Sequence, residues 1–76
     1  MNIKIRPKST RRFNFPFLAH TEDEVYRIIE TLVGDKIAPN GIPYAIEVSS
    51  WADLATIGEE YETEDFKAIC VGDYEL

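Results

Sequence analysis

The segment from Thr21 to Val33 places the strongest constraint on the fold, because it predicts a helix with one apolar side. Thr21 is followed three residues later by Glu24, which is the spacing of a capping box at the start of a helix. Gly34 follows the segment, and glycine readily adopts the left-handed conformation that ends a helix. Apolar residues recur between these two signals at helical spacing: Val25, Ile28, Ile29, Leu32 and Val33. Such a helix must pack its apolar stripe against another layer.

Alternating apolar and polar residues predict strands elsewhere in the chain. Residues 2–6 alternate isoleucine with basic side chains, and Pro7 ends this strand because it has no N–H to donate. Residues 13–17 alternate phenylalanine with asparagine and proline, which predicts an edge strand or an extended loop. Residues 60–63 and 66–71 predict a hairpin.

The middle of the chain is interpreted as a turn, a strand and a short helix. Residues 42–48 alternate apolar side chains with others, which predicts a strand with one apolar face. Ser50 is a candidate N-cap for a helix of about two turns over residues 50–57, and Gly58 is the expected end. This helix is expected to bury Trp51, Leu54 and Ile57.

The order of these elements predicts an α+β fold. A small three- to five-stranded sheet is expected, with one main helix (about 21–33) and one short helix (about 50–57) packed on it. A chain of 76 residues has room for a single domain, residues 1–76. The sequence leaves the order of the strands open.

The residues that could carry chemistry are few. Cys70 and His20 are the only cysteine and histidine, so the chain forms no internal disulfide and no closed zinc site. A Cys70–His20 nucleophile and base is the weaker interpretation, because Cys70 lies in an apolar strand where a thiol is inert. The sequence therefore predicts a protein that is not an enzyme and that uses no metal or cofactor.

The charges are distributed unevenly along the chain. The net charge is −6, yet residues 1–12 contain five basic side chains and no acidic one. Residues 13–76 contain all 14 acidic side chains and only three basic ones. We expect the basic N-terminal strand to lie beside acidic segments in the fold, so that the charges partly cancel.

The acidic part of the chain leads to the first functional hypothesis, a small interaction or regulatory module that binds another protein with a basic surface. Its most specific form is an inhibitor of a basic nucleic-acid-handling enzyme, of the kind that phages and mobile elements use against host defence. The candidate contact residues are Glu59, Glu60, Glu62, Glu64 and Asp65.

The basic N-terminal part leads to the alternative hypothesis, an accessory protein that binds nucleic acid. Arginines next to phenylalanines in residues 11–15 suit single strands, whose phosphates meet cations while their bases stack on rings. The overall negative charge argues against this alternative, because nucleic-acid binders are usually basic. The candidate residues are Lys4, Arg6, Lys8, Arg11 and Arg12.

The hydropathy of the chain indicates a soluble cytoplasmic protein. No segment is long and apolar enough to span a bilayer, and the N-terminus lacks the apolar stretch of a signal peptide. A core this small gives modest stability, so self-association into a homo-oligomer is left open as an additional source.

Overall fold

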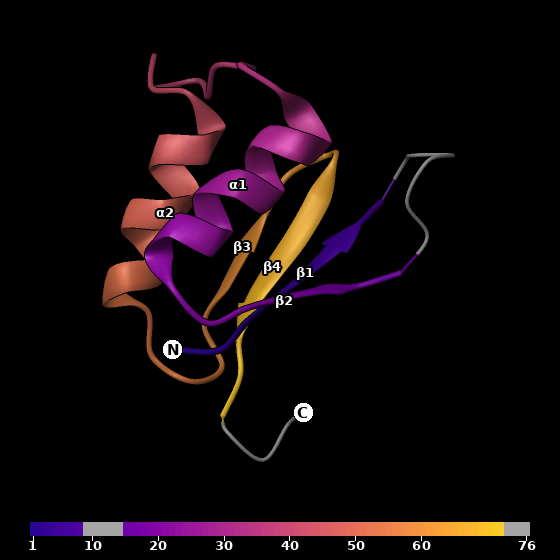
Figure 1. Cartoon of the computed structure of the whole chain (residues 1–76). Helices are drawn as coiled ribbons and strands as arrows, with labels where there is room; N and C mark the ends of the chain where they lie inside the picture. Colours follow the sequence, from indigo (N-terminus) through magenta and orange to yellow (C-terminus); the bar gives the residue numbers. More distant parts are fainter. Residues whose placement is uncertain (9–14, 73–76) are drawn as a thin grey trace.

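The computed structural model describes residues 1–8 and 15–72, which form one antiparallel sheet and two helices (Figure 1). The elements are β1 (Ile3–Pro7), β2 (Phe17–Ala19), α1 (Glu22–Val33), α2 (Tyr44–Leu54), β3 (Glu60–Glu62) and β4 (Phe66–Cys70). The strand order is β2-β1-β4-β3, and both helices cover the same face of the sheet. This confirms the α+β class, with four strands in the sheet.

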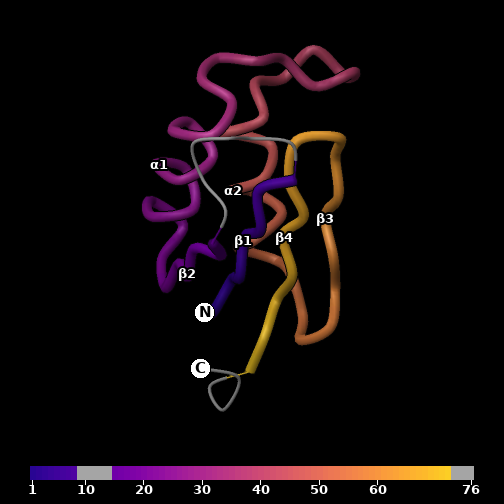
Figure 2. Tube along the Cα trace, turned by 90° about the vertical axis from the view of Figure 1, so that its right-hand side faces the viewer, coloured from indigo at the N-terminus to yellow at the C-terminus, as the bar shows by residue number. Residues whose placement is uncertain are grey.

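Two hairpins meet at the centre of the sheet. Strands β1 and β4 are the central pair, with Ile5 opposite Ala68 and Arg6 opposite Lys67. The expected hairpin of β3 and β4 is present, and β3 lies at the outer edge beside β4 (Figure 2). The N–H of Val71 donates to the carbonyl of Asn2 at 2.9 Å and extends the β1–β4 pairing. The sheet therefore has two edges, β2 and β3.

Helix α1 begins and ends as its sequence predicts. Thr21 caps the helix, and its hydroxyl accepts a hydrogen bond from the N–H of Glu24 at 3.1 Å. The Glu24 carboxylate in turn accepts from the N–H of His20, which completes a capping box shifted by one residue. Gly34 has a φ of 63° and donates its N–H to the carbonyl of Glu30. The apolar stripe of α1 faces the sheet and α2, and its buried residues are Val25 and Ile29.

The prediction of a strand over residues 42–48 is wrong, because α2 begins at Tyr44. The expected second helix is present, but its predicted bounds of about 50–57 are wrong at both ends. Ser50 lies in the interior of α2, and the helix ends at Leu54 before Ala55 takes an extended conformation. Only an isolated bridge between Ile37 and Pro43 retains strand character in this region.

The incorrect prediction of a strand over residues 42–48 has a physical cause. Apolar residues occupy both odd- and even-numbered positions between 42 and 52. The segment therefore matches the two-residue period of a strand and also the 3.6-residue period of a helix. The residues buried in the structure recur at helical spacing: Ala45, Val48, Ser49 and Ala52. Small side chains at these positions let α2 pack closely against α1.

The core lies between the sheet and the helix pair. Its largest fully buried side chains come from every layer: Phe66, Ile3, Ile5, Ile29, Val25 and Val48. The expectation that Leu54 and Ile57 would be buried is wrong, since they are 82% and 74% exposed. Trp51 is half-buried at the border of the core.

In the described part of the phenylalanine-rich segment, an edge strand begins at Phe17. Phe17 begins β2, which pairs with β1 and forms one edge of the sheet. Phe15 precedes the strand and is exposed, with its ring centroid 5.1 Å from that of Phe17. Phe13, Asn14 and the C-terminal tail from residue 73 lie outside the described residues.

Cys70 is a core residue at the end of β4. Its side chain is buried, and its sulfur lies 3.8 Å from the carbonyl oxygen of Ala55. The His20 ring instead lies 2.7 Å, through Nδ1, from the side-chain oxygen of Asn2. The two residues that could have formed a nucleophile and base thus each have another partner.

Candidate functional site

The five predicted acidic contact residues lie together along one edge of the sheet and its turn, which we call the acidic edge (Glu59, Glu60, Glu62, Glu64 and Asp65). Glu60 and Glu62 point from β3 to the helix-free face of the sheet, while Tyr61 between them points toward the helices. Glu64 and Asp65 form the turn to β4. The structure therefore places these carboxylates along β3 and the turn that follows it, with Glu59 at one end of the strand and Glu64 and Asp65 at the other.

Lysines from other segments neutralise much of the acidic edge. Glu62 pairs with Lys8 after β1, and Glu60 pairs with Lys67 of β4 at 3.1 Å. Of the basic N-terminal part, Lys8 lies beside an acidic residue, as the charge distribution predicted. Strand β1 itself lies between β2 and β4, with Arg6 opposite Lys67, so the expected pairing with acidic segments holds only for Lys8 among the described residues.

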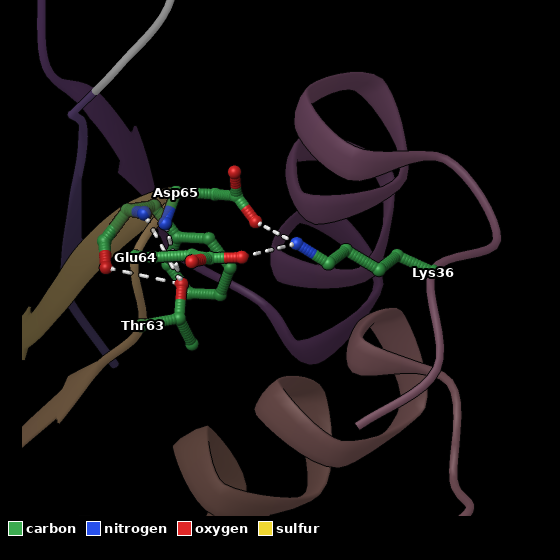
Figure 3. Close-up of polar contacts among 5 residues, drawn as sticks. Lys36, Thr63, Glu64 and Asp65 are labelled. Atoms are coloured by element: carbon green, nitrogen blue, oxygen red, sulfur yellow. Dashed lines mark hydrogen bonds and ion pairs between the residues drawn. The ribbon is translucent and has the colours of Figure 1, made fainter. Parts of the chain in front are cut away.

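Lys36, which follows α1, reaches the turn between β3 and β4 (Figure 3). Its Nζ lies 3.1 Å from a carboxylate oxygen of Glu64 and 2.6 Å from one of Asp65. In the same turn the Thr63 hydroxyl accepts from the N–H groups of Asp65 and Phe66. The turn is therefore held in one shape, with its two carboxylates directed at a single ammonium group.

The ionisation of these groups follows from their hydrogen bonds. The hydrogen bond and charge of Lys8 lower the pKa of Glu62 below its ordinary value. The hydroxyl and N–H of Thr56 donate to Glu59 at 2.7 and 2.9 Å and lower the pKa of that carboxyl. The hydrogen bonds to Asp65 and Glu64 raise the pKa of Lys36. These shifts favour the charged forms of Glu59, Glu62 and Lys36. Four of the five carboxylates of the acidic edge are in surface ion pairs, and Glu59 is hydrogen-bonded to Thr56 instead.

The alternative, basic set is only partly brought together. Lys4 and Arg6 lie on the helix-free face, and Lys67, which the sequence interpretation missed, lies opposite Arg6. The side chains that line a shallow hollow on this face are Lys4, Arg6, Lys67, Ile69 and Val71. Lys8 is paired with Glu62 instead, and Arg11 and Arg12 lie outside the described residues.

A third surface, on α2, was not expected from the sequence. Ile46 and Leu54 lie eight residues apart on the solvent side of the helix, and they are 45% and 82% exposed. Ile57 follows in the connection to β3 and is 74% exposed. We call these three residues the α2 outer surface. The pattern that could have revealed it is the apolar character of α2 on all sides.

The part of the chain that the structure describes contains no group of three or more His, Cys, Asp or Glu side chains arranged to hold a metal ion. None of its helices has the length and hydropathy needed to cross a bilayer. No family model, curated protein or solved structure gives a significant match to this chain.

Proposed function

We propose that this protein is a non-catalytic module that binds another protein through α2. The observation that carries the proposal is the α2 outer surface, where Ile46, Leu54 and Ile57 are exposed on one short stretch of chain. Full burial of an exposed aliphatic side chain is worth about 1.5–3 kcal/mol, so a partner that covers the mostly exposed Leu54 and Ile57 gains much of that free energy, and less from the half-exposed Ile46. Ile46 and Leu54 are on α2, and Ile57 follows it beside Val71 and Gly72. Exposed apolar side chains that are close together in this way are candidates for protein–protein contacts.

The charge around this surface defines the partner. Residues 37–66, which include all of α2 and β3, contain seven acidic side chains and no lysine or arginine. A second copy of the chain would bring two acidic surfaces together, which disfavours self-association through α2. The partner that fits is a protein with an apolar contact area bordered by basic residues.

The acidic edge has a supporting role in this proposal. Its carboxylates are engaged by Lys8, Lys36 and Lys67, so a partner must compete with ion pairs already formed. We therefore propose that the negative electrostatic potential of the acidic edge attracts a basic partner, which mainly increases the association rate. An inhibitor that occupies the basic groove of a nucleic-acid-handling enzyme is the most specific form of this proposal.

The proposal is tested by capture and identification of the partner. Immobilised wild-type protein is expected to retain a basic protein from a lysate of its source organism, identified by mass spectrometry. The double variant Leu54→Ser/Ile57→Ser is expected to lose that protein, because the apolar contact is gone. Both side chains are mostly exposed, so the fold should be retained, and circular dichroism checks this.

Two controls make the result specific. Leu18→Ser, on the helix-free face of β2, removes a partly exposed leucine elsewhere and is expected to leave capture unchanged. Sedimentation of the wild type measures whether a second copy occupies the surface instead. Equal capture by the wild type and the double variant, or a dimer that the double variant dissociates, would contradict the proposal.

Nucleic-acid binding through the helix-free face is a second candidate, favoured by the hollow that Lys4, Arg6 and Lys67 line. Such binding is expected to weaken steeply with salt, because each phosphate contact releases counterions. Fluorescence anisotropy with a labelled single-stranded oligonucleotide measures it. Binding at low salt that Lys4→Glu/Arg6→Glu abolishes would support this candidate, and no binding at low salt would reject it.

A further inference from the structure

The border between α2 and the edge strand β3 contains a half-exposed group of aromatic rings, with one carboxylate on the same side of α2. Tyr44, Glu47 and Trp51 follow one another at positions i, i+3 and i+7 of α2, so they lie on the same side of the helix. Tyr61 points toward them from β3. All four side chains are half-buried, and we call them the aromatic seam.

The rings of the seam are held in place by the core. The Trp51 and Tyr61 ring centroids are 5.8 Å apart. The fully buried Phe66 stacks on Tyr61 at 6.4 Å and meets the edge of Tyr44 at 6.1 Å. Because the buried Phe66 contacts both tyrosine rings, the side chains of the seam are already ordered before a ligand binds.

Glu47 has no cationic partner among the described residues, unlike Glu60, Glu62, Glu64 and Asp65 of the acidic edge. Its one hydrogen-bond contact is with the amide of Asn40, at 3.1 Å. Burial, the charge of Glu47 and the nearby Tyr44 raise the pKa of the Tyr61 hydroxyl, which is consistent with Glu47 lying on the same side of α2 as the rings. A half-buried negative charge beside hydroxyls and ring faces is an environment that favours a cation.

We propose that the aromatic seam binds an arginine side chain of the partner protein. The guanidinium is planar, so it can stack on Trp51 or Tyr61 while its N–H groups donate to the Glu47 carboxylate. Lysine would supply the charge without the planar surface, and an apolar side chain would leave the carboxylate without a counter-charge. The inference rests on the proposed function in one respect, that the arginine belongs to a partner protein.

Trp51 makes the proposal directly measurable, because it is the only tryptophan in the chain. We would titrate the isolated protein with N-acetyl-arginine amide and follow the Trp51 indole N–H by NMR. Saturable shifts at Trp51 and Tyr61 are expected, with a dissociation constant on the order of millimolar for one side chain. N-acetyl-citrulline amide, the neutral isostere, is expected to produce no saturable shift.

Matched variants test whether the Glu47 carboxylate is the charge that binds the arginine. Glu47→Gln is expected to weaken arginine binding about fivefold or more, while its amide oxygen still accepts from Asn40 and preserves the fold. Glu60→Gln removes a carboxylate from the other face of the same edge and is expected to leave the affinity unchanged. Trp51→Phe, followed at Tyr61, keeps an aromatic ring but reduces the stacking area and is expected to bind more weakly.

The outcomes separate this inference from the proposed function. Equal binding of arginine and citrulline, equal affinity of Glu47→Gln and wild type, or shifts centred on the acidic edge would each overturn the aromatic seam as an arginine site. The titration needs no partner, so it supports the site even if the capture experiment fails. A captured partner whose binding is unaffected by Glu47→Gln would support the module while rejecting the seam as its contact.

Discussion

Replacing Phe66 with alanine is expected to lower the free energy of unfolding by about 3–5 kcal/mol, the typical cost of removing a buried phenyl ring. Phe66 is completely buried at the start of β4. Its ring contacts those of Tyr44 from α2 and Tyr61 from β3, so it joins the helix layer to the sheet edge. Because small domains are stable by only several kcal/mol, we expect the variant to be largely unfolded at moderate temperature.

Urea denaturation followed by circular dichroism measures this effect. Ile57→Ala, which removes part of a side chain that is mostly exposed, is the matched control and is expected to change stability by less than about 0.5 kcal/mol. A loss below about 1 kcal/mol in Phe66→Ala would mean that the ring lies at the surface. The aromatic seam would then lack the support on which its preorganisation depends.

Replacing Ser50 with proline is expected to destabilise the protein by about 3 kcal/mol. Ser50 is exposed in the interior of α2, so proline would remove a helical hydrogen bond and clash with the preceding turn. The same substitution would be mild if the helix began at this residue, because proline is tolerated at the start of a helix. The stability of this variant therefore reports where α2 begins.

Ser50→Ala also tests whether Ser50 lies inside α2 or at its start, but with the opposite pattern of stability changes. In the interior of a helix, alanine is expected to be neutral or to stabilise by about 0.5 kcal/mol. At an N-cap, the loss of the serine hydroxyl would cost about 1 kcal/mol. A stable Ser50→Pro variant together with a destabilised Ser50→Ala variant would restore the helix that the sequence predicted over residues 50–57.

The two proposed contact regions share helix α2, which contributes Ile46 and Leu54 to the α2 outer surface and Tyr44, Glu47 and Trp51 to the aromatic seam. Ile46 and Leu54 face solvent, while Glu47 and Trp51 face the edge of the sheet. A partner that covers α2 can therefore gain apolar burial on one side and a charge-assisted contact on the other. In many interfaces a few aromatic residues and their ionic partners carry most of the binding energy.

Local signals in the sequence were sufficient to predict the elements whose ends are marked by capping or turn residues. Thr21, Glu24 and Gly34 determine where α1 begins and ends, because each satisfies a backbone group of the helix itself. The strand of residues 2–6 and the hairpin of β3 and β4 follow from their alternation. The place of the acidic run at a strand and its turn was likewise predictable from Glu60, Glu62 and the turn residues that follow.

Only the tertiary structure decided the state of residues 42–54 and the environment of the charges. An apolar segment without a clear period takes the conformation in which it buries the most surface, and packing against α1 made that conformation a helix. The ion pairs of Lys8 with Glu62 and of Lys36 with Asp65 join residues that are 54 and 29 positions apart in the sequence. The sequence by itself determined which side chains are charged or apolar, but the aromatic seam exists only because the fold brings Tyr61 and Phe66 against α2.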